Sequence, residues 1–230
     1  MIWVGTSGYN YPEWKGSFYP QNLAAAKMLP YYAERFPTVE INYTFYRTPN
    51  EKIVEGWSKA TPERFKLTLK APRRITHDAR LRDCGDRVRQ FLETAAVLGP
   101  KLGALLFQLP PNLKKDLPRL TDFLALLPAA SRCAFEFRHD SWFDAEVFDA
   151  LRGARAALCW AEDESLATPQ EATAGWGYLR LRRSDYVDAH LDAWAERIRT
   201  QPWTEAYVFF KHEEEATGPR LAEAMRARLP

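Results

Sequence analysis

The stretch Ala134-Phe135-Glu136-Phe137-Arg138 alternates apolar and charged side chains and ends on an arginine. Side chains on a β-strand point alternately to opposite faces, so this segment places both phenylalanines on one face and both charges on the other. Four other segments share the pattern and end on a polar or charged residue: Val39-Glu40-Ile41-Asn42, Lys66-Leu67-Thr68-Leu69-Lys70, Tyr178-Leu179-Arg180-Leu181-Arg182 and Tyr207-Val208-Phe209-Phe210-Lys211. A buried charge is costly unless it is paired. The pattern therefore predicts a polar pocket at the ends of several strands.

Strand-like and helix-like patterns alternate along the whole chain. The predicted strands are Ile2 to Gly5, Val39 to Asn42, Lys66 to Lys70, Ala104 to Gln108, Cys133 to Arg138, Ala156 to Trp160, Tyr178 to Arg182 and Ala206 to Lys211. The predicted helices are Leu23 to Arg35, Glu51 to Lys59, Asp86 to Leu98, Asp116 to Leu127, Asp144 to Arg152, Asp188 to Arg199 and Gly218 to Leu229. Residues 161–175 lack a clear helical pattern and are predicted to form a loop.

Eight strands with mostly helical connections favour a parallel sheet covered by helices. Eight is also the number of strands that closes a (β/α)8 barrel, a fold of ~200 to ~250 residues. We therefore predict an α/β fold in which residues 1–230 form one TIM-like barrel domain. An open doubly wound sheet is the rival topology. Against it, the first strand is followed by Gly5-Thr6-Ser7-Gly8 and not by the Gly-x-Gly-x-x-Gly turn of dinucleotide-binding folds.

Composition limits the possible classes of protein. The 230 residues are 46% hydrophobic and 27% charged, as in an ordinary globular protein, and the net charge of +2 is too small to indicate nucleic acid by itself. The three cysteines are isolated and form neither a disulfide framework nor a zinc motif. The N-terminus has no basic leader pattern, and no segment reaches the ~18 apolar residues of a membrane span. We expect a cytoplasmic protein without a membrane partner.

Several motifs together resemble the YecE-like family, a group of barrel proteins classed as domain of unknown function 72. The motifs, which extend over essentially the whole chain, are Gly5-Thr6-Ser7-Gly8-Tyr9, Trp14-Lys15-Gly16-Ser17-Phe18-Tyr19-Pro20, Val39-Glu40-Ile41-Asn42 with Phe45-Tyr46, Lys70-Ala71-Pro72 with Thr76-His77, Gln108-Leu109-Pro110-Pro111, Glu136-Phe137-Arg138 with Ser141-Trp142, and Lys211-His212-Glu213. The resemblance implies a TIM-like barrel. It supplies no reaction, substrate or cofactor, so these must be inferred from the residues.

Strand parity predicts which polar side chains meet at the open end of the barrel, where the active sites of such barrels lie. The predicted set is Glu40, Asn42, Lys70, Gln108, Glu136, Arg138, Arg180, Arg182 and Lys211. Five of these are cations and two are anions, and adding Asp163 still leaves a cationic surplus. Arginine forks bind phosphate and carboxylate groups, so the surplus predicts a small anionic ligand. The last helix, which begins near Thr217-Gly218-Pro219, is a further candidate for anion binding.

The sequence also suggests roles for these side chains in an enzyme of unknown reaction class. Glu136 and Glu40 are the candidate proton-transfer pair, and Lys70 is an electrophile or an orienting charge, with Schiff-base chemistry as a minor alternative. The candidate substrate-binding residues are Asn42, Gln108, Arg138, Arg180, Arg182, Lys211, His212 and Tyr9. The four histidines are scattered and no metal motif is present, so we predict no metal site and no cofactor.

Three alternatives remain open from the sequence. The charges can form an internal salt-bridge network, for example Glu136 with Lys70 or Arg180, that fixes geometry without turnover. The barrel can be a nucleic-acid-processing or nucleic-acid-binding protein, by fold-level analogy only. It can also be a non-catalytic ligand-binding module. The leading hypothesis is an enzyme that acts on a phosphorylated or carboxylated metabolite, with sugars among the candidates.

Overall fold

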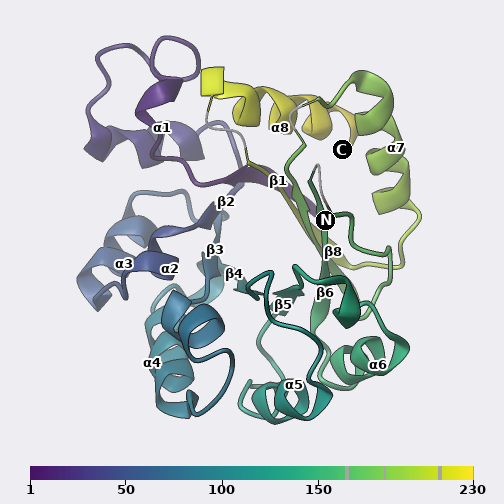
Figure 1. Ribbon diagram of the computed structural model, residues 1–230. Helices are drawn as coiled ribbons and strands as arrows, with labels where there is room; N and C mark the ends of the chain where they lie inside the picture. Colours follow the sequence, from purple (N-terminus) through teal and green to yellow (C-terminus); the bar gives the residue numbers. More distant parts are fainter. Residues whose placement is uncertain (164–165, 184, 212–213, 230) are drawn as a thin grey trace.

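A computed structural model describes residues 1–163, 166–183, 185–211 and 214–229. Eight parallel strands form a closed barrel in the order of the sequence, and β1 pairs with β8 to complete it (Figure 1). The strands are β1 (Ile2–Ser7), β2 (Thr38–Ile41), β3 (Lys66–Lys70), β4 (Leu102–Gln108), β5 (Cys133–Glu136), β6 (Ala157–Glu162), β7 (Trp176–Leu181) and β8 (Glu205–Phe210). The predicted barrel is confirmed, and the open doubly wound sheet is excluded because no edge strand is left.

Helices surround the barrel, and most of them connect one strand to the next (Figure 1). They are α1 (Met28–Ala33), α2 (Tyr43–Tyr46), α3 (Glu51–Lys59), α4 (Gly85–Ala96), α5 (Leu117–Leu124), α6 (Ala145–Gly153), α7 (Asp188–Arg199) and α8 (Thr217–Arg228). Helices α3 and α7 have their predicted bounds. Helix α1 is shorter than predicted, because Ala25–Lys27 form a separate 3-10 turn, and the short α2 is an addition to the predicted elements. The described residues between β6 and β7 contain no helix, as expected.

Side chains on each strand separate into two cores, as the alternation predicts. Phe135 and Phe137 lie in the larger core between the strands and the helices. Ala134 faces the barrel interior, in a second core that includes Leu106, Tyr178, Tyr207 and Phe209. The interior is therefore filled by side chains at these levels and is a packed core.

Gly5 is the position in β1 where the backbone of β2 and a helix side chain come closest. A Cβ atom on Gly5 would clash with the backbone carbonyl of Thr38 and lie 2.9 Å from the hydroxyl of Tyr32. We expect Gly5→Ala to lower the free energy of unfolding by at least about 1–3 kcal/mol, because the carbonyl belongs to a paired strand and cannot move freely. Urea denaturation measures this change.

Gly153, at the end of α6, is the matched control for this substitution. A Cβ atom on Gly153 would meet no neighbouring atom within 4 Å. We expect Gly153→Ala to be neutral or stabilising by ~0.5–1 kcal/mol, since alanine restricts the unfolded chain more than glycine does. Equal unfolding midpoints for the two variants would contradict the close approach at Gly5.

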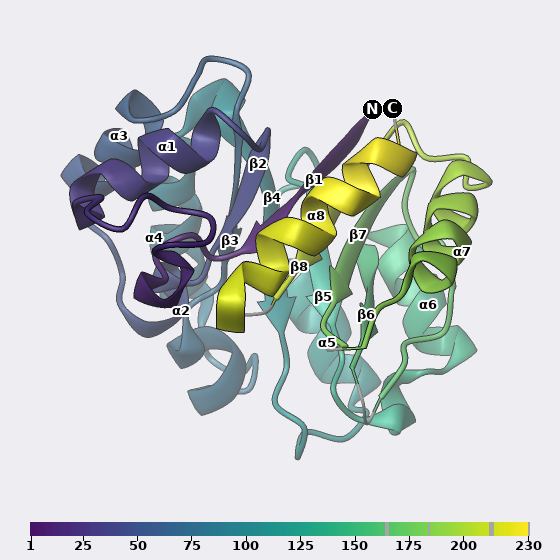
Figure 2. The ribbon, with the colours of Figure 1, turned by 90° about the horizontal axis from the view of Figure 1, so that it is seen from above.

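The beginning of strand β1 and the end of helix α8 lie next to each other (Figure 2). The amino group of Met1 donates a hydrogen bond of 2.8 Å to the carbonyl oxygen of Thr204, just before β8. The first and last elements of the barrel are thus joined at the end opposite to the C-terminal strand ends. Within the described ranges, no helix has the length and apolar character needed to cross a membrane.

Candidate functional site

A buried ion-paired group, Glu40, Arg180 and Glu136, lies across the barrel interior just below the C-terminal strand ends. We call these three residues the buried triad; the two carboxylate side chains are 0% exposed and the Arg180 side chain is 2% exposed. Arg180 donates from Nη2 to Glu40 Oε1 at 2.8 Å and from Nη1 to Glu136 Oε2 at 2.5 Å. Because the three residues come from β2, β5 and β7, one guanidinium links strands on different sides of the barrel.

Hydrogen bonds from neighbouring side chains complete the coordination of both carboxylates. Glu40 accepts a bond from the hydroxyl of Ser7 and another of 2.6 Å from the hydroxyl of Tyr178. Glu136 accepts a bond of 2.9 Å from Nε2 of Gln108. Buried charges with this degree of pairing are held in a fixed geometry.

The electrostatics of the triad favour two permanently ionised carboxylates. Burial, the largest single influence, raises the pKa of Glu40 and of Glu136, but Arg180 together with the neighbouring cations and hydrogen-bond donors outweighs it, and both pKa values lie below the ordinary value. For Glu136 the shift is large, because Arg182 and Arg138 add to the effect of Arg180. A carboxylate with a strongly lowered pKa is a weak base at neutral pH.

A second layer of charges lies above the triad. Arg182 donates to Glu136 Oε1 at 2.9 Å, and Arg138 donates to the same oxygen at 3.2 Å. Both arginines also pair with Asp163 Oδ2, at 3.2 Å and 2.9 Å. Asp163, a speculative addition to the set predicted from the sequence, therefore lies in the polar network and connects β6 to its neighbours.

Aromatic side chains enter the site from the segments that follow β1 and β2. Gly8 has a φ of +95°, which turns the chain after β1 and leads into Tyr9 and Tyr11. Helix α2 begins at Tyr43, directly after Asn42, whose side chain donates to the Ser7 hydroxyl at 3.0 Å. These turns place aromatic rings beside the C-terminal strand ends.

Helix α3 supplies the remaining apolar part of the site. It begins after Asn50, whose side chain accepts a hydrogen bond of 3.0 Å from the backbone N–H of Ile53. Ile53 and Trp57 are four residues apart and so share one helix face. The rings of Trp57 and Tyr43 pack edge to face, with 5.9 Å between their centroids.

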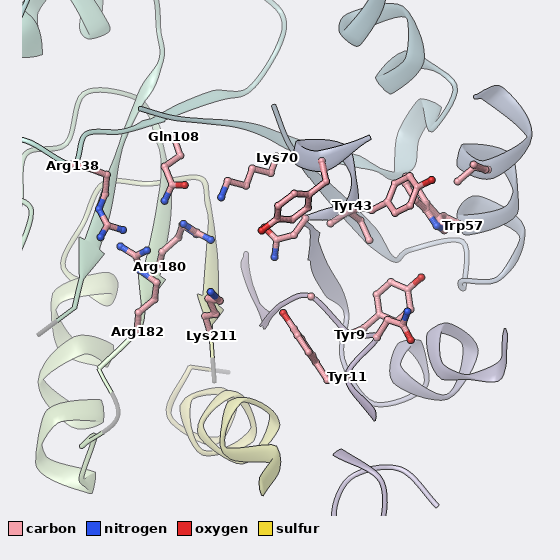
Figure 3. A pocket seen from close by; sticks show the side chains of 16 residues that line it. Tyr9, Tyr11, Tyr43, Trp57, Lys70, Gln108, Arg138, Arg180, Arg182 and Lys211 are labelled. Atoms are coloured by element: carbon pink, nitrogen blue, oxygen red, sulfur yellow. The ribbon is translucent and has the colours of Figure 1, made fainter. Parts of the chain in front are cut away.

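These elements enclose a cavity of about 700 Å³ at the C-terminal strand ends. The cavity has two chemically different sides, shown in Figure 3. We call Lys70, Arg138, Arg182 and Lys211 the cationic wall, and Tyr9, Tyr11, Tyr43 and Trp57 the aromatic wall. The volume suits a small organic molecule.

Lys70 has the most altered basicity of the cationic wall. Desolvation by burial, together with the nearby Arg180 charge, lowers the pKa of Lys70 to about 7, although Glu136 and Glu40 act in the opposite direction. Its Nζ atom lies 4.2 Å from the centroid of the Phe45 ring. A lysine with this pKa exchanges its proton near neutral pH.

The cavity brings together most of the candidate site residues predicted from the sequence. Those lining it are Tyr9, Asn42, Lys70, Gln108, Arg138, Arg180, Arg182 and Lys211. Glu40 and Glu136 lie behind this lining as part of the buried triad, so the sequence alternative of an internal salt-bridge network is present within the site. His212 lies outside the described residues.

One expectation from the sequence needs correction. The N-terminus of α8 does not line the cavity, since Gly218 and Pro219 are buried against the core.

Sequence reasoning missed Tyr43, Ile53 and Trp57 as part of the site. The spacing of Ile53 and Trp57 was a usable signal, but a helix face can equally pack on the barrel.

Among the residues that the structure describes, no group of three or more His, Cys, Asp or Glu side chains has the arrangement of a metal site.

A family model described as "Protein of unknown function DUF72" matches residues 3–230. The chain belongs to the DUF72 family. Among curated relatives, the UPF0759 protein YecE of Escherichia coli (strain K12) is 33% identical to this DUF72 chain over 144 residues, which are 62% of the chain and 50% of the relative. The UPF0759 protein YunF of Bacillus subtilis (strain 168) is 30% identical over 168 residues, 70% of the chain and 58% of the relative. The DUF72 chain thus spans about half the length of the curated relatives it matches.

Solved DUF72 structures have the same fold. A DUF72 family protein from Thermotoga maritima MSB8 has a TM-score of 0.85 and 25% identity, with 99% of this chain and 98% of that chain covered. One from Enterococcus faecalis V583 has a TM-score of 0.83 and 19% identity, with 100% and 95% covered, which shows the fold alone. The family description names no reaction, so the chemistry of the cavity must indicate the function.

Proposed function

We propose that this DUF72 chain is an enzyme that acts on a small phosphorylated or carboxylated metabolite by acid–base chemistry. The observation that supports this most strongly is the cavity of about 700 Å³, in which the cationic wall lies opposite the aromatic wall (Figure 3). Guanidinium and ammonium groups bind phosphate or carboxylate oxygens. Aromatic rings stack on the flat or apolar face of a ring, including a sugar ring. A ligand with an anionic group at one end and a ring at the other matches both walls.

The charges in and directly behind the cavity favour an anion. Among the described residues there, the cations Lys70, Arg138, Arg180, Arg182 and Lys211 outnumber the carboxylates Glu40, Glu136 and Asp163 by two. This surplus of cations supports binding of an oxyanion.

We assign proton transfer in this proposal to Lys70. Its pKa of about 7 allows both protonation states near neutral pH, as a general acid or base requires. Glu40 and Glu136 are the proton-transfer pair predicted from the sequence. Both have lowered pKa values and form ion pairs with Arg180. In the proposal, these carboxylates hold the guanidinium in place.

The three isolated cysteines, all free and buried, support the further proposal of a cytoplasmic location.

Thermal unfolding with defined anions tests the binding step. We expect the melting temperature to rise with inorganic phosphate, and to rise further with phenyl phosphate at equal concentration, since only the latter reaches the aromatic wall. Tyr43→Ala should weaken phenyl phosphate binding by about tenfold, the effect of one lost stacking partner, and leave inorganic phosphate binding unchanged. Tyr43 is 41% exposed, so the variant should fold.

The outcome that contradicts the proposal is a melting temperature that no anion changes. A screen of sugar phosphates and oxo acids for turnover then tests catalysis itself. The non-catalytic module predicts binding without turnover, whereas the enzyme predicts turnover that is lost in Lys70→Met.

A further inference from the structure

Lys70 differs from the arginines of the site in having no polar partner among the described residues. Arg138, Arg180 and Arg182 each form ion pairs with buried or half-buried carboxylates. The Lys70 amine forms no hydrogen bond or ion pair with any described residue, and it lies instead over the face of the Phe45 ring. It nevertheless lines the cavity at the end of β3, beside Gln108 from β4 (Figure 3).

This placement is what a nucleophilic amine requires. A lysine that is paired with a carboxylate is held as an ammonium group, which has no lone pair available for attack, and its position is fixed. The aliphatic stem of Lys70 is instead fixed by a buried strand, while its amine is directed into a cavity large enough for a ligand. Arg138, Arg182 and Lys211, the other members of the cationic wall, would hold an anionic group of that ligand, which leaves another part of the ligand to meet Lys70.

We propose that Lys70 is a nucleophile that forms a Schiff base with the carbonyl group of an anionic ligand. The ligand class is a small oxo acid or a phosphorylated aldehyde or ketone. This inference rests on the proposed function, because it uses the same cavity and the same anion-binding side chains. It replaces the proton-transfer role of the Lys70 amine in that proposal by a covalent role.

The covalent step balances without another reactant. The ammonium of Lys70 first loses a proton to solvent, and the amine nitrogen then forms a bond with the carbonyl carbon. The carbonyl oxygen takes up one proton from that nitrogen and one proton returned by solvent, and it leaves as water while a C=N bond replaces the C=O bond. The nitrogen keeps one proton and is positively charged, so the net change is ammonium plus carbonyl to protonated imine plus one water.

The surrounding charges support a reactive amine. Desolvation and the Arg180 charge lower the pKa of Lys70 to about 7, so roughly half of the amine is neutral at pH 7, about a thousandfold more than for an ordinary lysine. The charged groups that influence it are Glu40 on β2, Glu136 on β5, Arg180 on β7 and Lys211 after β8. His77 is also near, since its own pKa is lowered by burial and then by Lys70.

Reductive trapping tests the inference. The full chain is incubated at pH 7 with pyridoxal 5′-phosphate, a phosphorylated aromatic aldehyde, or with pyruvate, a small oxo acid. Borohydride then reduces any imine to a stable amine, and mass spectrometry of the digested protein locates it. We expect labelling of Lys70 at least about a hundredfold faster than labelling of the exposed Lys59, with a rate that rises through a midpoint near pH 7.

Controls separate this inference from the proposed function. Lys70→Met should abolish cavity labelling while circular dichroism shows a folded protein, and inorganic phosphate should slow labelling of the wild type. Preferential labelling of Lys211, or equal rates for Lys70 and Lys59, would overturn the nucleophile. Anions that leave both labelling and the melting temperature unchanged would instead contradict the proposed function.

Discussion

Replacing Arg180 with methionine should lower the free energy of unfolding by about 3–5 kcal/mol at pH 7. The substitution leaves the carboxylates of Glu40 and Glu136 buried without the cation that both of them contact. Methionine approximates the volume of the lost side chain, so the effect is chiefly electrostatic. Urea denaturation monitored by tryptophan fluorescence measures it.

The same variant should have a different pH dependence. In the native protein both carboxylates have folded pKa values below their unfolded values, so their contribution is fully present above the unfolded pKa of ~4.3 and is lost as the pH falls through the folded pKa values. Without Arg180, burial dominates at Glu40 and raises its folded pKa above the unfolded value. The ionised Glu40 carboxylate then lowers the free energy of unfolding of the variant at neutral pH. Protonation of this carboxylate at lower pH removes that effect. The difference between the two proteins should therefore shrink as the pH falls toward 4.

Arg152 provides the control for removing an arginine from an ion pair. It pairs with Asp149 and Glu171 at the surface, with 44% of its side chain exposed. Arg152→Met should cost less than about 1 kcal/mol. In a double-mutant cycle, Glu40→Gln should cost much less in the Arg180→Met protein than in the native protein, because Arg180, the cation that pairs with this carboxylate, is already absent. Equal effects of Arg180→Met and Arg152→Met would show that the buried triad does not stabilise the barrel.

Replacing Arg182 with methionine should weaken the binding of phenyl phosphate by about 10- to 100-fold. Arg182 belongs to the cationic wall, and a hydrogen bond between charged groups contributes about 1.5–3 kcal/mol. Isothermal titration calorimetry measures the dissociation constant, and thermal unfolding of the free variant shows how far the loss of its contacts with Glu136 and Asp163 changes stability.

Arg183 is the matched control for this prediction. It carries the same charge and follows Arg182 directly, but it pairs with Asp185 at 2.7 Å and does not line the cavity. Arg183→Met should leave the dissociation constant for phenyl phosphate within about twofold of the native value. If both variants weaken binding equally, the attraction comes from the overall charge of the protein and not from the cationic wall.

The sequence predicted the barrel and its polar end because β-strand parity is a local property. The alternation at Phe135, Glu136, Phe137 and Arg138 alone determines which side chains face the helices and which face the axis. Parity does not determine pairing. Arg180 contacts both Glu40 and Glu136 because of the relative stagger of β2, β5 and β7. No single segment of sequence determines that stagger.

The aromatic wall shows a second limit of prediction from sequence. Tyr43 and Trp57 lie on helices after β2, and their direction depends on how the chain turns after Asn42 and around the cap at Asn50. An aromatic residue on an amphipathic helix packs against the barrel in most cases, so spacing alone could not assign Trp57 to the cavity. Tyr9 was easier to assign, because it follows β1 by only two residues.

The pairing of β1 with β8 has a consequence for the biosynthesis of this protein. The two strands are adjacent in space but about 200 residues apart in sequence, so the ring cannot close until the ribosome has released β8. Until then β1 and β7 present unpaired backbone groups, which are templates for intermolecular association. A chain interrupted between β7 and β8 should therefore accumulate as insoluble aggregates and depend on chaperones.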